Sequence, residues 1–339
     1  MSRLRTASLV HGHAADRGAT VTVLPERERL AHVDPRVWKL LFRCLQPVDI
    51  DELRAEGFED DVIEAARSLR LVVDADADCL WEEHRWTRGA HLLFSQLDAA
   101  YVDDDATDGT DTRRHEVARY LRERPYPPRR PYEGTPFALP EPAGEPPIGA
   151  LDALATRRSV RAFARRAVPV ATIAEILWAA TVKVREAERA QASGDPYELL
   201  NSYYAWLDLH IVNQGIDGLP PGVHRYDPLE HVLWRTRDDA ADDEVVAIAA
   251  HQPWAAGSGA AIFLAVQWDR WRWLYRSSRG YMTLLVQAGE FSQELLGAIY
   301  RRRLGAWVTP AIHETSAAKL LSLPAGIDAL MLVKLGPAA

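Results

Sequence analysis

The chain has 339 residues, of which 47% are hydrophobic, and it carries a formal net charge of −8 at pH 7. This length suffices for two domains, and the composition is that of a globular protein. The acidic balance argues against general nucleic-acid binding, and no apolar run approaches the ~20 residues needed to cross a bilayer. The N-terminus lacks the apolar core of a signal peptide, so we expect a cytoplasmic protein in which Cys44 and Cys79 are free thiols.

Residues 1–80 predict a small separate domain with the order strand, three helices, strand. A β-prone run at residues 20–24 comes first, and residues 71–73 supply a returning strand. Asp34 and Asp49 can cap the free backbone N–H groups of the first two helices, and the region of Asp60 opens the third. The first helix has one apolar face, made of Val37, Leu40, Leu41, Cys44 and Leu45. This order is typical of a winged-helix unit.

The charge of this domain bears on its ligand. The pattern is similar to the PqqD-like leader-peptide recognition elements of peptide-modifying enzymes, whereas other winged helices bind DNA. Residues 47–70 contain eight acidic side chains against three arginines, a balance that repels phosphate groups. Peptide binding is therefore favoured over DNA binding, and a packing module without a ligand is the alternative.

Residues 81–148 are expected to connect the two halves of the chain. A helix is predicted from Trp86 through Leu97, followed by an acidic run at residues 103–109 whose carboxylates lack the spacing of a calcium loop. The proline-rich stretch at residues 125–147 favours an extended strap, either a linker or an arm that crosses a partner subunit.

The most informative stretch of the chain is Arg157-Arg158-Ser159-Val160-Arg161. Each guanidinium group offers a rigid fork of donors that matches phosphate oxygens, and the serine hydroxyl adds one more donor. An amphipathic helix follows, with Ile173, Ile176 and Leu177 on one face, so we expect the run at the entrance to this helix, where an anion binds. Taken alone, these five residues also fit a solvated basic turn.

The C-terminal half predicts several strands that can pair into a sheet. Their ranges are 207–211, 223–226, 231–234, 260–266 and 330–335. The second and third form a hairpin around Asp227 and Pro228. In the first strand, Asp208 and His210 alternate with apolar residues, which predicts that only one of its faces is buried.

A long core helix is predicted, with its apolar positions at Met282, Leu285, Val286, Gly289, Leu296 and Ile299. Gly289 within it would let another helix approach closely. Three arginines at residues 301–303 suit the end of this helix, because cations complement its free carbonyl groups. Gly305 just beyond permits a left-handed turn.

Five spaced segments carry a family resemblance, over roughly residues 150–336. They are Arg-Arg-Ser-x-Arg-x-Phe at 157–163 with Leu-Trp-Ala-Ala at 177–180, the hairpin at 218–228, Gln-Pro-Trp at 252–254, Arg-Gly-Tyr at 279–281 and Gln-Ala-Gly at 287–289. In these segments the chain resembles the nitroreductase superfamily, and within it the SagB-type dehydrogenases that oxidise azoline rings in ribosomal peptides.

The resemblance implies an α+β, nitroreductase-like FMN fold over residues 149–339, in which an antiparallel-rich sheet is packed by helices and FMN lies at a homodimer interface. It implies that the phosphate is held by Arg157, Arg158, Ser159 and Arg161. Asn201 and Ser202 would donate hydrogen bonds near the flavin ring, and Arg279 and Gly305 would complete the cofactor site. No metal is expected, because histidines such as His210 lack companions at ligand spacing.

Two departures from the family pattern concern the flavin ring and the catalytic base. Bulky side chains, Tyr203, Tyr204 and Trp206, stand where the family has small residues, and they would either stack on the ring or fill its pocket. The Lys-Tyr pair of these dehydrogenases is replaced by Leu274-Tyr275. Tyr275 is then the candidate base, provided that Arg276 or Arg279 acidifies it; the alternative is an ordinary half-buried aromatic.

The predicted function is an FMN-dependent oxidation of an azoline to an azole in a peptide or peptide-like intermediate of natural-product biosynthesis. A cyclodehydratase or another biosynthetic protein is the expected partner. The alternative is a catalytically altered subunit that keeps the fold, binds leader peptide and scaffolds a modifying complex. A third possibility is flavin-dependent reduction of a small substrate or dehydroamino acid.

Overall fold

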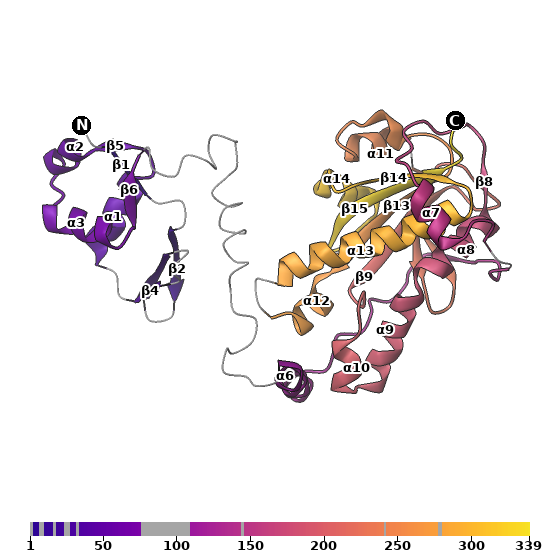
Figure 1. Ribbon diagram of the computed structural model, residues 1–339, viewed down its shortest axis with the longest axis horizontal. Coiled ribbons are helices and arrows are strands. Elements are labelled where there is room, and N and C mark those ends of the chain that lie inside the picture. Colours follow the sequence, from indigo (N-terminus) through magenta and orange to yellow (C-terminus); the bar gives the residue numbers. More distant parts are fainter. Residues whose placement is uncertain are drawn as a thin grey trace. The chain divides into compact units, whose positions relative to one another are not determined.

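The computed structural model describes residues 3–6, 10–15, 18–23, 28–31, 34–75, 109–143, 146–240, 242–276 and 280–339. The chain divides into two compact units, Met1–Tyr101 and Val102–Ala339 (Figure 1). Within the described ranges, no helix combines the length and apolar character needed to span a membrane. Cys79, the helix predicted from Trp86 and the acidic run at 103–108 lie outside the described residues.

The first unit packs three helices against a small antiparallel sheet. The helices are α1 (Pro35–Arg43), α2 (Ile50–Ala55) and α3 (Asp60–Ser68). The sheet has the order β5 (Val48–Asp49), β1 (Arg3–Thr6), β6 (Val72–Asp74). Asp34 and Asp49 cap α1 and α2 as predicted, accepting from the backbone N–H groups of Arg36 and Asp51 at 2.8 and 3.0 Å. The winged-helix-like arrangement is confirmed.

The first strand of this unit is β1, and not the β-prone run at residues 20–24 as predicted. The β-prone run lies in β3 (Gly18–Val23), which pairs with β2 (Val10–Ala15) and β4 (Glu28–Ala31) in a separate sheet, whereas β6 pairs with β1. The sequence of β1 is short and half polar, so only its pairing partners identify it as a strand. Leu45, expected on the face of the first helix, lies beyond the end of α1 and is 48% exposed.

The second unit is built on one seven-stranded sheet. Its order is β14 (Gly305–Thr309), β15 (Ile327–Gly336), β13 (Ala260–Gln267), β9 (Leu207–Asn213), β11 (Gly222–Asp227), β12 (Val232–Arg237) and β7 (Thr135–Ala138). Every neighbouring pair in it is antiparallel. The short strands β8 (Val168–Pro169) and β10 (Ile216–Asp217) pair in parallel. With helices on both faces, the sheet confirms the predicted α+β fold.

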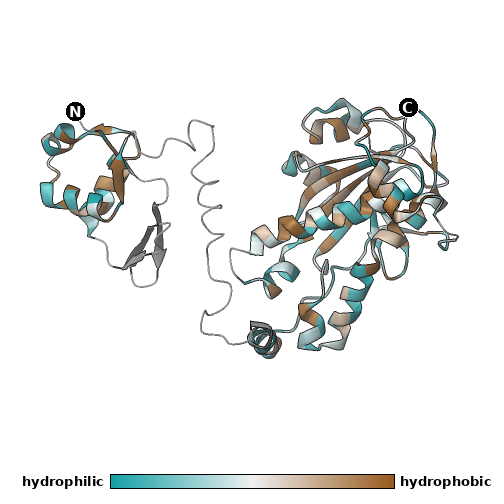
Figure 2. Cartoon of the chain, viewed as in Figure 1, coloured by the Kyte–Doolittle hydropathy of each residue, from teal (hydrophilic) through white to brown (hydrophobic). Residues whose placement is uncertain are grey.

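Helices cover both faces of the sheet. The larger core lies beneath α8 (Val170–Ala180) and α13 (Gly280–Arg301), with α7 (Ala150–Thr156) packed on α13. The second core lies beneath α11 (Asp242–Ile248), the 3₁₀ turn η2 (Pro253–Ala255) and α14 (Glu314–Leu320). Strand β13 contributes to both, with Ile262 in the first and Phe263 in the second, so it is apolar from Ala260 to Val266 (Figure 2). The remaining helices are α6 (Gly109–Glu123), α9 (Val182–Ser193), α10 (Pro196–Leu200) and α12 (Trp268–Leu274).

Residues 109–148, predicted as a connector, are part of this second unit. Helix α6 packs against α10, and β7 forms an edge of the large sheet. The strap between them, residues 124–134, is extended as its prolines predict, and the Arg129 guanidinium ties it to the Leu207 carbonyl oxygen at 2.8 Å. The strap also covers β9, which is why Asp208 and His210 are buried and β9 has two buried faces rather than the one predicted.

Candidate functional site

The arginine cluster, which we define as Arg157, Arg158, Ser159 and Arg161, follows the end of α7 and crosses one end of the large sheet. Ser159 forms an isolated β-bridge with Ala306 of β14, and the backbone N–H of Val160 donates to the Ala306 carbonyl oxygen at 2.9 Å. Helix α8 begins only at Val170, so the expectation that the cluster lies at a helix entrance is wrong. The cluster is instead held by pairing with a strand.

The guanidinium groups of the cluster are open to an anion. Arg158 and Arg161 are exposed, Arg157 is half-buried, and within the described part of the chain none of the three forms an ion pair. Nη1 of Arg158 donates to the Arg157 carbonyl oxygen at 2.7 Å, and the Arg161 guanidinium lies 5.5 Å from the ring centre of Trp254. Exposed guanidinium groups without carboxylate partners attract phosphate or carboxylate.

Gly305 allows the cluster to lie close to β14. A Cβ atom at this buried position would be 2.7 Å from Cγ2 of Val160, far inside van der Waals contact. The glycine is therefore required by close approach and not by its backbone angles. The left-handed residue that ends α13 is Arg303, with φ of 58°, so the prediction that Gly305 makes this turn is wrong.

Asn201 and Ser202 lie at the end of α10, and their side chains are already engaged there. The Asn201 amide donates to the Tyr197 carbonyl oxygen at 3.1 Å, and the buried Ser202 hydroxyl donates to the Leu199 carbonyl oxygen at 2.6 Å. Among the bulky residues that follow, Tyr204 is buried edge-on to Phe291, and Trp206 is equally buried. Both belong to the core, while Tyr203 is half exposed.

Tyr275 is the half-buried centre of an ordered polar and aromatic group. Its ring stacks on Trp271 at 4.0 Å between centroids. Gln287 of α13 donates from Nε2 to the Tyr275 hydroxyl at 3.3 Å, and its Oε1 accepts from Nε1 of Trp206 at 2.8 Å. The guanidinium of Arg113, from α6, lies 5.9 Å from the ring centre of Tyr275. A hydrogen-bond donor and a cation thus lie beside the phenol.

The cations expected beside Tyr275 are not the ones that the structure describes there. The Arg276 guanidinium lies 3.5 Å from the ring centre of Tyr120 and forms an ion pair with Glu123 at 2.8 Å. Arg279 lies outside the described residues. Leu274, at the position of the family's lysine, is buried with Val117 and its neighbours.

The arginine cluster and Tyr275 lie at opposite ends of α13. The hydroxyl of Tyr300, near the C-terminal end of the helix, donates to the Arg158 carbonyl oxygen, whereas Gln287 near its start contacts Tyr275. These two helix positions are about 20 Å apart at a rise of ~1.5 Å per residue. A single chain therefore does not bring the two halves of the predicted site together.

Sequence reasoning missed two side chains that shape these groups. Trp271 orients Tyr275 by stacking, and Arg113 supplies the cation, but they come from α12 and α6 and no local pattern links them. Trp254 and Gln287 lie within segments already singled out, at residues 252–254 and 287–289.

Comparisons with known proteins bear on these observations. A model of the nitroreductase family matches residues 154–336. In sequence, the chain is 26% identical over 284 residues to the trifolitoxin operon protein TfxC of Rhizobium leguminosarum bv. trifolii, covering 79% of this chain and 77% of TfxC.

Solved structures give further similarities. A protein from Anabaena variabilis assigned as a nitroreductase matches with a TM-score of 0.50 and 19% identity over 61% of this chain. The match spans 42% of that protein, so it concerns the fold alone. The E. coli microcin synthetase McbBCD complex with truncated pro-MccB17 bound gives a TM-score of 0.43 and 14% identity, with 91% of this chain and 95% of that chain covered.

Proposed function

The chain belongs to the nitroreductase family, and we propose that it is an FMN-dependent oxidoreductase acting on a peptide or peptide-like intermediate of natural-product biosynthesis. The proposed step is the two-electron oxidation of a thiazoline or oxazoline ring to the aromatic azole. Members of the family generally bind FMN. Bound FMN would supply a hydride acceptor, which oxygen or another acceptor then reoxidises.

The arginine cluster carries this proposal. Its guanidinium groups are exposed or half-buried, lack carboxylate partners within the described ranges and are fixed to β14 by backbone pairing. A scaffold protein has no need for such a concentration of unpaired charge. The residues fit the phosphate of FMN, and we assign Arg157, Arg158, Ser159 and Arg161 to hold it, with Gly305 keeping the loop against the sheet.

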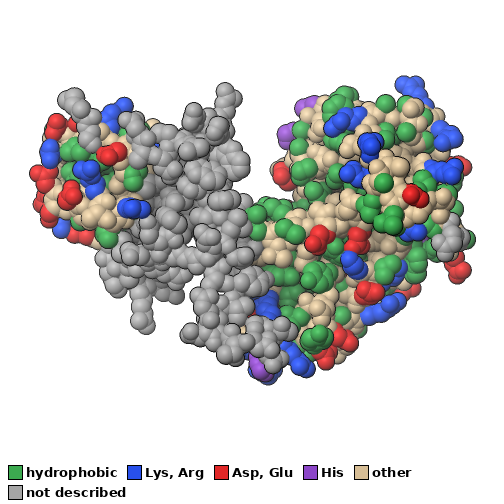
Figure 3. Space-filling model, viewed as in Figure 1, with side chains coloured by type: hydrophobic (Ala, Val, Ile, Leu, Met, Phe, Trp, Pro, Cys, Tyr) green, Lys and Arg blue, Asp and Glu red, His purple; other side chains and the backbone are tan. Residues whose placement is uncertain are grey.

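The surface of α13 supports a homodimer. Gly289 and Gly297 lie on this helix, and a Cβ atom added at either would have nothing within 4 Å, so no contact within the described chain requires a glycine there. A glycine inside a helix costs ~1 kcal/mol relative to alanine, which points to a close approach from outside. Val286, one turn from Gly289, is 59% exposed, and Figure 3 shows hydrophobic side chains gathered over this part of α13.

A two-fold dimer would join the separated halves of the site. A two-fold interface pairs the same patch of both chains. We propose that the two α13 helices meet near Gly289 in an antiparallel arrangement. The start of one helix, with its Tyr275, would then lie toward the arginine cluster of the other chain. Along the helix axes, Gln287 of one chain and Tyr300 of the other would then be about nine residues, ~13 Å, apart, against ~20 Å within one chain.

Tyr275 is the proposed proton acceptor. Oxidation of an azoline removes a ring proton as well as a hydride, so a base must lie beside the ring. The hydrogen bond from Gln287 favours negative charge on the phenol oxygen, and the stack on Trp271 fixes its direction. The Arg113 guanidinium lies 5.9 Å from the ring centre and is itself paired with Glu116 at 2.8 Å. In this proposal, the surroundings of Tyr275 compensate for the lysine that the family has at the position of Leu274.

The relative from the trifolitoxin operon supports the biosynthetic setting. We propose that other proteins of such a pathway, for example a cyclodehydratase, supply the azoline. The winged-helix-like unit is proposed to bind the leader segment of the peptide, because its surface is rich in carboxylates that repel nucleic acid.

The second candidate is a subunit that scaffolds a modifying complex without catalysis. The side chains of Asn201 and Ser202 favour the scaffold, because each already donates a hydrogen bond to a carbonyl oxygen of α10 instead of pointing a donor at a flavin. Leu274, which cannot accept a proton, favours it as well.

One experiment separates the two candidates. The full chain is mixed with FMN, desalted, and its visible absorption measured. Retained flavin at about one per subunit, followed by azole formation from an azoline peptide, supports the enzyme. A colourless protein that still binds a leader peptide supports the scaffold and excludes the flavin enzyme. Retained flavin without turnover of any azoline peptide leaves an oxidoreductase and rules out this substrate class.

A further inference from the structure

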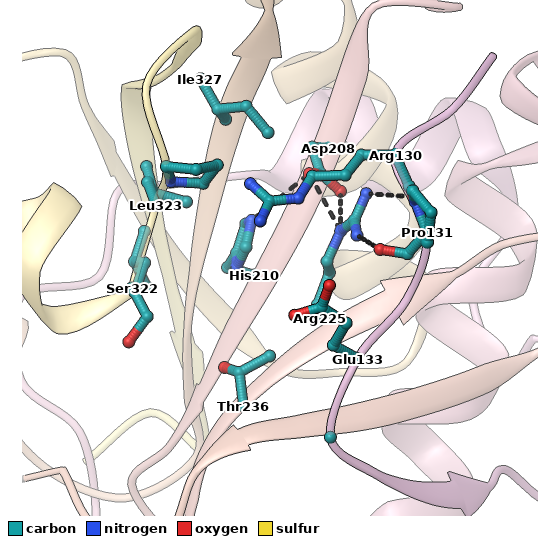
Figure 4. Close-up of a pocket in the computed structure, with 13 residues that line it drawn as sticks. Arg130, Pro131, Glu133, Asp208, His210, Arg225, Thr236, Ser322, Leu323 and Ile327 are labelled. Atoms are coloured by element: carbon teal, nitrogen blue, oxygen red, sulfur yellow. Dashed lines mark hydrogen bonds and ion pairs between the residues drawn. The ribbon is translucent and has the colours of Figure 1, made fainter.

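A cavity of ≈ 280 Å³ opens on the face of the sheet opposite α13. Its floor is formed by Asp208 and His210 of β9 and Arg225 of β11, and its walls by the strap and by the loop after α14, as Figure 4 shows. The lining is completed by Thr236 of β12 and by Ser322. Nothing in the predicted flavin site uses these residues.

The strap wall of the cavity is rigidly held. Nη1 of Arg225 donates to the Pro131 carbonyl oxygen at 2.7 Å, and Nη2 donates to that of Arg130 at 3.1 Å. Gly134, with φ of 110°, then lets the strap turn against β12, because a Cβ there would lie 2.1 Å from the Arg235 carbonyl oxygen. The Arg130 side chain is therefore presented at a defined place.

The carboxylate of Asp208, on the cavity floor, is already bonded to Arg225. Both oxygens of Asp208 accept from Nε of Arg225, at 2.9 and 3.0 Å. Burial alone would raise the pKa of Asp208, but the nearby His210 and the charges of Arg225 and Arg129 outweigh it and hold that pKa well below its usual range. A metal cation would have to displace Arg225, so the cavity is not built for one.

Two other side chains at the cavity form no hydrogen bond with any described residue, although the His210 ring lies within ion-pair distance of Asp208. His210 is 3% exposed, yet neither ring nitrogen forms a hydrogen bond; its Nε2 lies 3.6 Å from Oδ2 of Asp208, beyond hydrogen-bonding range. The Arg130 guanidinium likewise has no ion pair or hydrogen bond with any described residue, and Figure 4 shows it reaching into the cavity near His210. Leaving a buried polar group without a hydrogen bond costs free energy, which a ligand can recover.

We propose that this cavity binds a small oxyanion, a carboxylate or a phosphate. The Arg130 fork would grip two of its oxygens, the His210 ring would donate to one, and the Thr236 hydroxyl lies on the adjoining wall. In the lining, Arg225 is already bonded to Asp208, and Glu133 is exposed, so the Arg130 guanidinium is the charge that remains available to an anion.

This site is distinct from the arginine cluster. Strand β13 pairs Ala265 with Asp208 at one end, and Ala260 with Leu335 at the other, where Leu335 in turn pairs with Ala306 beside the cluster. The two places are thus separated by about 17–20 Å along the strands, at ~3.4 Å per residue. Anion binding in this cavity can therefore be tested independently of FMN binding.

The test uses the full chain with Arg158→Gln, so that anions held by the arginine cluster do not contribute. Inorganic phosphate and succinate are titrated by calorimetry, with neutral succinamide as the control ligand. Arg130→Gln is then compared with Arg189→Gln, which removes the same charge from the exposed face of α9. The ring nitrogens of His210 are followed by NMR in the chain with Arg130 intact, so the result does not depend on folding of a buried variant.

Saturable binding of either anion, weakened about tenfold or more by Arg130→Gln but not by Arg189→Gln, is expected from the loss of one charge-assisted contact. Shifted His210 ring resonances on titration place the anion in the cavity. Preference for succinate identifies a carboxylate ligand, and preference for phosphate identifies a phosphorylated one. No saturation below about 10 mM, a limit weaker than −3 kcal/mol, overturns the proposal, as does equal binding by the two arginine variants.

Discussion

Val160 packs so closely against Gly305 that a methyl group on the glycine would lie 2.7 Å from Cγ2 of the valine. The contact fixes the arginine cluster to β14, because Val160 also donates its backbone N–H to Ala306. A substitution at Gly305 therefore tests whether the position of the loop matters without removing any charge.

Gly305→Ala is expected to push the loop outward and weaken FMN binding about tenfold, the equivalent of one charge-assisted hydrogen bond. Fluorescence titration of FMN measures it. Gly149→Ala is the control, since the nearest atom to a Cβ there is an Asp152 carboxylate oxygen at 3.6 Å, an ordinary contact distance. Equal affinities for the two variants would show that FMN does not depend on this loop.

Arg158→Ala should weaken FMN binding about 10- to 100-fold, because it removes a guanidinium group that the described part of the fold leaves without a carboxylate partner. Arg165→Ala removes a similarly exposed charge outside the cluster and should leave the affinity unchanged. If both variants bind FMN like the native chain, the cluster serves a different ligand.

Val286→Glu should shift the protein from dimer to monomer, because it places a charge where two α13 helices are proposed to meet. Light scattering after size-exclusion chromatography gives the mass. Leu229→Glu changes another exposed apolar residue, 47% exposed in the β11–β12 turn, and should stay dimeric. A native chain that is monomeric at every concentration tested would remove the basis for the shared site.

Tyr275→Phe should lower azole formation by ~10²- to 10⁴-fold, the usual worth of a positioned base, while FMN affinity stays constant. The phenylalanine ring can keep the stack on Trp271, so the change isolates the hydroxyl. Tyr281→Phe is the control, because it also removes a hydroxyl from a tyrosine whose ring stacks on a tryptophan of α12, in this case Trp268. Full activity in Tyr275→Phe would assign the proton transfer to another group.

Asp208→Asn tests the buried carboxylate through pH. The pKa of Asp208 is lower in the folded chain than the 3.8 of an ordinary aspartate, so its ionised form stabilises the fold above about pH 4, and this stability is lost as the pH falls further. Urea unfolding should show Asp208→Asn less stable by about 3–5 kcal/mol at pH 7, with a smaller loss toward pH 3. The exposed Asp217→Asn is the control; parallel acid profiles for the native chain and Asp208→Asn would contradict the assignment.

Local signals explain which parts of the fold could be predicted from sequence. Asp34 and Asp49 cap helices through contacts with residues two positions away, and the apolar spacing of α13 identifies it as a helix. Its buried face was placed incorrectly in part, because Leu285 and Val286, predicted in the core, are 40% and 59% exposed. The family resemblance located the arginine cluster. These features depend on neighbours in sequence or on a motif, so they are visible without coordinates.

Contacts between distant segments explain the rest. Asp208 looked solvent-facing because its alternation with leucines is the same whether or not a strap covers it, and the partner Arg225 becomes visible only when β9 and β11 pair. The separation of Tyr275 from the cluster depends on the length of α13 between them. No local sequence pattern predicts either of these two relationships.

The strap and β7 have a consequence for where the folding unit begins. Pairing with Thr135–Ala138 satisfies the outer backbone groups of β12, although the family match starts only at residue 154. Without that upstream strand, β12 would present an open row of N–H and C=O groups, which recruits strands from other molecules. The segment before the recognisable family sequence thus supplies the outermost strand beside β12, and the structural unit begins before the residues that the family model matches.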